Sequence, residues 1–119
     1  MLFRSNADGS VNCAAEIPPG ALVQIMKTTA ESAVTAARHA TESAIEGLRG
    51  EKAGAALFFD CVATRLRMGD AFGIELDSVS KALKGAGLVG CNTYGQIARA
   101  TGQFGGFHNC TAVVMVLPE

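Results

Sequence analysis

The pattern of apolar and polar positions near the amino terminus predicts a β-hairpin. Residues 11–17 are a plausible strand, and residues 21–26 resume as a second one, with Leu22, Gln24 and Met26 alternating against Val23 and Ile25. The Pro-Pro-Gly sequence at 18–20 interrupts the ladder and permits a reversal. Residues 6–9 precede the first strand and read as a tight turn, because Asp and Gly suit such a connection.

The next segment repeats its apolar residues every three or four positions, which is typical of an amphipathic helix. Thr28 and Glu31 form a capping-box pattern at its start, because each side chain can bond the backbone amide of the other residue. Gly50 is well placed to end the helix. The apolar stripe is mostly alanine, so we expect the helix to lie close against the surface that it covers. The stripe contains Ala30, Ala33, Val34, Ala37, Thr41, Ala44, Ile45 and Leu48.

An unbroken apolar run at residues 53–60 predicts a buried central strand. Residues 62–69 are interpreted as a loop, and Asp70 as the N-cap of a second helix that ends at Gly85. The apolar seam of that helix consists of Phe72, Leu76, Val79 and Leu83.

Short apolar stretches complete the chain. Residues 88–93 and 95–98 predict short strands, and the valine-rich residues 110–117 predict the last one. The resulting order, ββαβαββ, favours an α+β two-layer sandwich with a mixed, mostly antiparallel sheet and two helices on one face. We interpret residues 1–119 as a single domain, since this length can bury a core without disulfides or metal.

Composition excludes several classes of protein. A formal net charge of −1 does not favour a surface that neutralises nucleic acid or anionic lipid. No segment approaches the roughly 20 apolar residues that span a bilayer, and residues 1–9 turn polar too soon for a signal peptide. The four cysteines form no CxxC pair, as expected of reduced thiols. These features predict a cytoplasmic protein.

Candidate binding residues gather in the last third of the chain. Tyr94 offers a ring that can stack, Gly95 allows close backbone approach, and Gln96 can donate and accept hydrogen bonds. The alternative is a turn between strands with the tyrosine packed on the core. The glycines near these residues do not form a dinucleotide-binding fingerprint.

Cysteine and histidine chemistry leaves further readings open. Cys61 follows a buried strand, where side chains often meet ligands, although most such thiols are inert core residues. His108 and Asn109 precede the last strand and could bind a polar group or form a turn. A zinc site would need Cys61, Cys91, Cys110 and His108, of which only His108 and Cys110 have the usual paired spacing and would share one face of a strand. A Cys61–His108 pair oriented by Asn109 would make a thiol hydrolase.

Several separate motifs resemble, in order, the C-terminal half of the FIST sensory domain. The similarity extends over residues 9–118, nearly the whole chain. The motifs are Gly20-Ala21 after the proline-rich turn, Leu-Phe-Phe-Asp-Cys at 57–61, Gly69 before a helix, residues 90–97, and Phe-His-Asn-Cys-Thr at 107–111 before an apolar strand.

The resemblance implies a sensory domain of a signal-transduction protein that binds a small molecule and is not an enzyme. In that family the domain is coupled to modules such as histidine kinases, cyclases, chemotaxis transducers or an F-box, and amino acids are the proposed ligands. A small carboxylate is the other ligand that we consider. One branch resembles a haem-dependent nitric oxide sensor, for which His108 would be the axial ligand. No other cofactor or metal is expected. The ligand-binding residues implied are Cys61, Tyr94, Gly95, Gln96, His108 and Asn109.

Two positions depart from the pattern of the family. Gln96 stands where the family commonly has a glutamate, and Thr64 stands where it commonly has an arginine, three residues after Cys61. A ligand held through that charge pair would be recognised differently here. The N-terminal half of a complete FIST protein also has no counterpart in this chain. We therefore expect an uncovered apolar face, self-association into a homo-oligomer, and the N-terminal FIST half or a signalling module as partner.

Overall fold

The computed structural model describes residues 3–13, 16–99 and 106–119. Its elements in chain order are β1 (Phe3–Ser5), β2 (Val11–Cys13), α1 (Ala30–Glu46), β3 (Ala53–Cys61), α2 (Val62–Met68), the short 3-10 helix η1 (Gly69–Ala71), α3 (Phe72–Ala82), β4 (Gly87–Thr93), β5 (Gln96–Ala98), β6 (Gly106–His108) and β7 (Val113–Pro118).

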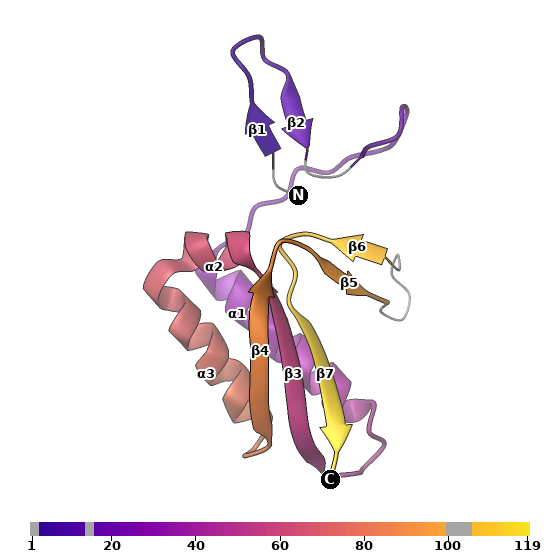
Figure 1. The fold of residues 1–119 in the computed structure, drawn as a ribbon, viewed down its shortest axis with the longest axis vertical. Coiled ribbons are helices and arrows are strands. Elements are labelled where there is room, and N and C mark those ends of the chain that lie inside the picture. Colours follow the sequence, from indigo (N-terminus) through magenta and orange to yellow (C-terminus); the bar gives the residue numbers. More distant parts are fainter. Residues whose placement is uncertain (1–2, 14–15, 100–105) are drawn as a thin grey trace.

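The principal sheet has three strands in the order β4-β3-β7, so the apolar run at 53–60 forms the central strand as predicted (Figure 1). Strand β3 runs parallel to β4 and antiparallel to β7, and Phe58 lies opposite Gly90 on one side and Val114 on the other. The parallel pair requires a crossover, which α2 and α3 provide.

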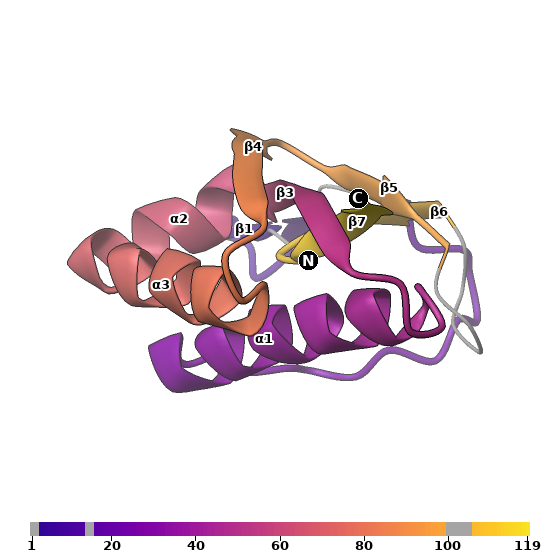
Figure 2. The same cartoon turned by 90° about the horizontal axis from the view of Figure 1, so that it is seen from below.

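Helices α1 and α3 cover one face of this sheet, and the core lies between the two layers (Figure 2). The fully buried core residues are Ala37 of α1, Ala56 and Phe58 of β3, and Val79 and Leu83 at α3. The predicted α+β two-layer sandwich with a mixed sheet is therefore confirmed. The element order is longer than the predicted one, because it contains the additional helix α2 and the separate β5–β6 hairpin.

The start of α1 lies one residue later than predicted. Thr29, not Thr28, is the N-cap: its hydroxyl accepts the Ser32 amide at 3.1 Å, and the Ser32 hydroxyl accepts the Thr29 amide at 3.0 Å. Thr28 and Thr29 can both cap a helix. In the structure the box is completed by Ser32, three residues after Thr29, and not by Glu31.

The alanine stripe of α1 is buried as predicted. Ala33, Ala37 and Thr41 face the core, and the Thr41 hydroxyl donates to the carbonyl of Ala37 at 2.8 Å. The helix ends with Gly47 as its C-cap, earlier than the predicted Gly50. Gly50 instead has φ +98° in the turn that follows, where glycine is favoured because it lacks a Cβ.

The predicted hairpin of residues 11–17 and 21–26 is wrong. Strand β2 pairs antiparallel with the preceding strand β1 across the turn at residues 6–9, and residues 21–26 form no strand. The Asp8 carboxylate stabilises this turn, because it accepts bonds from the amide and hydroxyl of Ser10 at 2.9 and 2.6 Å, which also lower the pKa of Asp8. Residues 14 and 15 of the predicted first strand lie outside the described residues.

The segment after β3 was predicted to be a loop, and that prediction is also wrong. Residues 62–68 contain no glycine or proline and form α2, which ends where Gly69 adopts φ +55°. Asp70 lies in η1 and is not a cap, since Ala71 occupies the N-cap position of α3 without a side-chain bond. The Arg65 guanidinium covers the ring of Phe72 at 4.8 Å and joins the two helices.

The face of the sheet opposite α1 and α3 is not covered within the described part of the chain. Val89, Met115 and Leu117 lie on it with 64%, 52% and 43% of their surface exposed. We call this surface the uncovered face, and the register of the three strands places on it Ala55, Leu57, Phe59, Val89, Cys91, Val113, Met115 and Leu117.

Candidate functional site

Polar side chains meet at the carboxyl end of the parallel pair β3 and β4. In the register of these strands, Asp60 lies opposite Asn92 and Cys61 lies opposite Thr93. Ligands of open sheets with parallel strands commonly bind beyond this end, where the connections leave room. Because successive side chains of a strand alternate, Asp60 shares the helix-covered face with Phe58, while Cys61 points to the other side.

On the helix-covered side, two carboxyl groups are buried together. Asp60 and Glu75 of α3 are each only 1% exposed, and the Asn92 amide donates to Asp60 at 3.4 Å. Burial raises the pKa of Asp60. Burial and, after it, the charge of Asp60 raise the pKa of Glu75 to about 7. Glu75 therefore exchanges its proton near neutral pH.

Cys61 is fully buried and is the N-cap of α2. Burial acts to raise the pKa of its thiol, but the nearby backbone amides of Cys110, Ala63 and Thr64 lower it overall.

Gln96 is buried and bonds to Thr93, the residue that lies opposite Cys61. Its amide nitrogen donates to the hydroxyl of Thr93 at 2.8 Å and to the carbonyl at 3.2 Å. His108 lies opposite Gln96 across the β5–β6 hairpin, and its Nε2 lies 3.2 Å from the carbonyl oxygen of Ala98. The imidazole is therefore engaged by the backbone of the hairpin itself.

The remaining predicted residues are placed differently. Tyr94 is 86% exposed, so its ring does not pack on the core. Gly95 allows the ring of Phe107 to approach, because a Cβ at this position would overlap that ring. Asn109 places its side-chain oxygen in the interior, while its backbone carbonyl accepts from the Thr111 hydroxyl at 3.0 Å.

Four buried side-chain oxygens around this end of the sheet have no hydrogen-bond partner among the described residues. Each such oxygen costs roughly 1–3 kcal/mol when no donor meets it, so a bound molecule or water that supplies donors would stabilise the fold. The four unpaired oxygens are Thr64 Oγ1, Glu75 Oε2, Gln96 Oε1 and Asn109 Oδ1.

Of the residues predicted from sequence, the structure connects Cys61 and Gln96 through Thr93, which lies opposite Cys61 and accepts a hydrogen bond from Gln96. Sequence reasoning missed Asp60 and Glu75 as site residues. Glu75 did leave a signal, since it occupies the buried stripe of α3 three residues after Phe72 and four before Val79, where a carboxylate is unexpected.

A cavity of about 230 Å³ lies between α3 and β4 and reaches this cluster at Asn92. Phe72 and Leu76 line one wall, and Leu88 and Gly90 line the other. None of the four unpaired oxygens lines this cavity, which meets the cluster only at Asn92.

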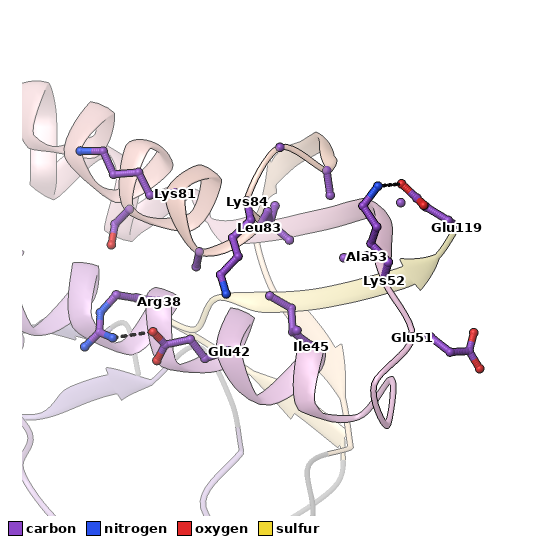
Figure 3. Close-up of a pocket in the computed structure, with 15 residues that line it drawn as sticks. Arg38, Glu42, Ile45, Glu51, Lys52, Ala53, Lys81, Leu83, Lys84 and Glu119 are labelled. Atoms are coloured by element: carbon purple, nitrogen blue, oxygen red, sulfur yellow. Dashed lines mark hydrogen bonds and ion pairs between the residues drawn. The ribbon is translucent and has the colours of Figure 1, made fainter.

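A larger cavity, of about 830 Å³, lies at the opposite end of the sheet between the last turns of α1 and α3 (Figure 3). It is bordered by charged side chains, among them the Arg38–Glu42 ion pair at 2.6 Å and the exposed pair of Lys52 with Glu119. None of the four unpaired oxygens lines it. Because it lies at the opposite end of the sheet from Asp60 and Asn92, we do not assign the candidate site to it. A third cavity, of about 100 Å³, is lined by Thr64 and the amino-terminal end of α1.

Metal and haem chemistry finds no support in the described residues. No group of three or more His, Cys, Asp and Glu side chains that could hold a metal forms there, so the zinc set that includes His108 is not assembled. Haem does not fit either, because His108 Nε2 already lies against Ala98 and lines none of the three cavities. In the same part of the chain, no helix is long and apolar enough to cross a membrane.

Comparison with known proteins gives one result. The family model described as the FIST C domain matches residues 1–99. No curated protein and no solved structure gives a significant match.

Proposed function

Because the chain belongs to the FIST C domain family, we propose that it is a sensory domain that binds a small molecule and performs no catalysis. The family is a sensory and signal-transduction family. The match includes Cys61 and Gln96 and stops before Asn109. As part of the same proposal, the domain passes its signal to a further module in the cytoplasm.

The observation that carries the proposal is the buried Asp60–Glu75 pair at the carboxyl end of the sheet, where Glu75 Oε2 has no hydrogen-bond partner; Thr64, Gln96 and Asn109 supply three further unpaired oxygens. All four atoms accept hydrogen bonds, and the two neighbouring carboxyl groups of Asp60 and Glu75 add negative charge when they ionise. A ligand with a positively charged amino group supplies donors and charge together. We therefore favour an amino acid over a carboxylate that lacks an amine.

Ligand binding of this kind should release a proton near neutral pH. Glu75 has a pKa of about 7, so it is partly protonated there. An ammonium group beside it would favour the carboxylate and lower that pKa. Calorimetric titration in buffers of different ionisation enthalpy would detect the released proton.

A thermal shift screen tests the proposal, because a ligand that binds only the folded state raises the melting temperature. We expect an amino acid to raise it, while the matched carboxylic acid without the amine does not. Glu75→Gln and Gln96→Leu should abolish the shift. Tyr94→Ala is the control, since that ring is 86% exposed and should not affect binding. A shift that survives both site variants, or no shift with any amine, would contradict the proposal.

The thiol hydrolase has one observation in its favour, the lowered pKa of Cys61. Against it, Cys61 is fully buried, whereas Cys91 is exposed. Iodoacetamide separates the two readings, because an accessible thiolate reacts faster than an ordinary thiol. We expect Cys91 to label first and Cys61 only when the protein unfolds. Faster labelling of Cys61 than of Cys91 in the folded protein would favour the enzyme.

A further inference from the structure

Residues 21–26 form an exposed apolar segment that has the sequence of a strand. Leu22, Val23, Ile25 and Met26 are 94%, 59%, 101% and 81% exposed, and the segment contains no charged residue. It adopts no regular structure and makes no sheet pairing. A contiguous apolar stretch of this kind usually marks a contact with another surface.

The outer edge of β4 is a matching surface. Strand β4 pairs only with β3 among the described strands, so its second row of backbone N–H and C=O groups remains open. Such an edge is a template for another strand. The register places Val89 and Cys91 on the uncovered face and Leu88 and Gly90 on the helix-covered face, and all four residues border the 230 Å³ cavity along this edge.

We propose that residues 21–26 of one copy add as a strand to the outer edge of β4 of a second copy, and that the exchange is reciprocal. One alternate row of the segment then lies over the uncovered face next to Val89, and the other row enters the cavity between β4 and α3. Both surfaces are apolar and free of charge, so their burial leaves no unpaired ion.

Stacking of two uncovered faces alone would not suffice. Strands β3, β4 and β7 have nine, seven and six residues. At about 3.3 Å for each residue and about 4.8 Å between strands, they give a footprint of about 350 Å², whereas a stable interface buries about 800 Å² on each partner. Strand exchange adds a six-residue segment and a row of main-chain hydrogen bonds on each side. A two-fold arrangement doubles this contribution, which favours a second copy as the occupant.

Sedimentation velocity over a range of protein concentrations tests the proposal. We expect a dimer that is lost in Val23→Lys and in Val89→Lys, because each change places a charge in the apolar contact. Leu66→Lys is the matched control, since Leu66 of α2 is 77% exposed and lies outside the contact. A parent protein that stays monomeric, a dimer that survives both variants, or an equal loss in the control would overturn the proposal.

Disulfide trapping distinguishes exchange between copies from docking within one chain. Residues 24 and 25 belong to opposite rows, so either Gln24→Cys or Ile25→Cys should form a disulfide with the exposed Cys91. The oxidation uses a mixture of isotopically heavy and light protein, and mass spectrometry reads the linked peptides. Heavy–light links to Cys91 support the proposal. Links within one chain only, or no link to Cys91 in either variant, overturn it.

Discussion

Replacement of Glu75 by glutamine should make the protein more stable than the parent at high pH, and this advantage should disappear at low pH. Glu75 is 1% exposed, and its pKa is about 7 in place of the ordinary 4.5. That difference means that ionised Glu75 is less favourable in the folded protein than in the unfolded chain by about 3 kcal/mol. Glutamine has a similar shape and never ionises, so it escapes the cost.

The sign follows from proton binding. Between about pH 4.5 and pH 7 the folded parent holds a proton on Glu75 that the unfolded chain has released, so its free energy of unfolding falls as the pH rises through this range and is then level. Glu75→Gln should match the parent near pH 5, apart from local hydrogen-bond changes, and exceed it by up to about 3 kcal/mol at pH 8.

Urea unfolding followed by circular dichroism at several pH values between 5 and 8 measures this difference directly. Subtraction of the two curves removes the contributions of all groups that both proteins share. Glu16→Gln is the control, because Glu16 is exposed and should leave the pH dependence unchanged. Parallel curves for Glu75→Gln and the parent would refute the argument, since they would mean that Glu75 is already ionised in the folded state.

Two further predictions concern the fold. Gly90→Ala should destabilise the protein by about 2–3 kcal/mol or more in urea unfolding, because the new Cβ would overlap the carbonyl oxygen of Phe58. Gly73→Ala, whose Cβ would meet no atom within 4 Å, should instead stabilise α3 by up to about 1 kcal/mol. Similar effects at both positions would contradict the strand geometry. Thr29→Ala should cost about 1 kcal/mol of stability through loss of the N-cap, whereas Thr28→Ala should be neutral; the reverse result would restore the register predicted from sequence.

The fold was largely predictable where burial and periodicity agree. The apolar run at 53–60 forms the central strand, and the alanine stripe of α1 lies against the core. Prediction failed where the local pattern needs a partner from elsewhere in the chain. Residues 21–26 alternate as a strand does, but no described strand lies beside them to complete the ladder. Residues 62–69 lacked a clear amphipathic period, so the helix was not recognised.

The candidate site was predictable only in part, because its residues meet through topology. Cys61, Gln96 and Asn109 were identified by residue type and by motif. Asp60 and Glu75 are separated by a complete crossover, and no spacing along the chain indicates that one raises the pKa of the other. That contact depends on how α3 returns over the sheet.

Strand β3 contributes side chains to both faces of the sheet. Its odd-numbered residues, such as Leu57 and Phe59, lie on the uncovered face, while Phe58 and Asp60 lie on the helix-covered face. Both rows belong to one backbone, which is hydrogen-bonded to a neighbouring strand on each side. A partner that covers Leu57 and Phe59 would therefore rest on the same strand that carries Asp60.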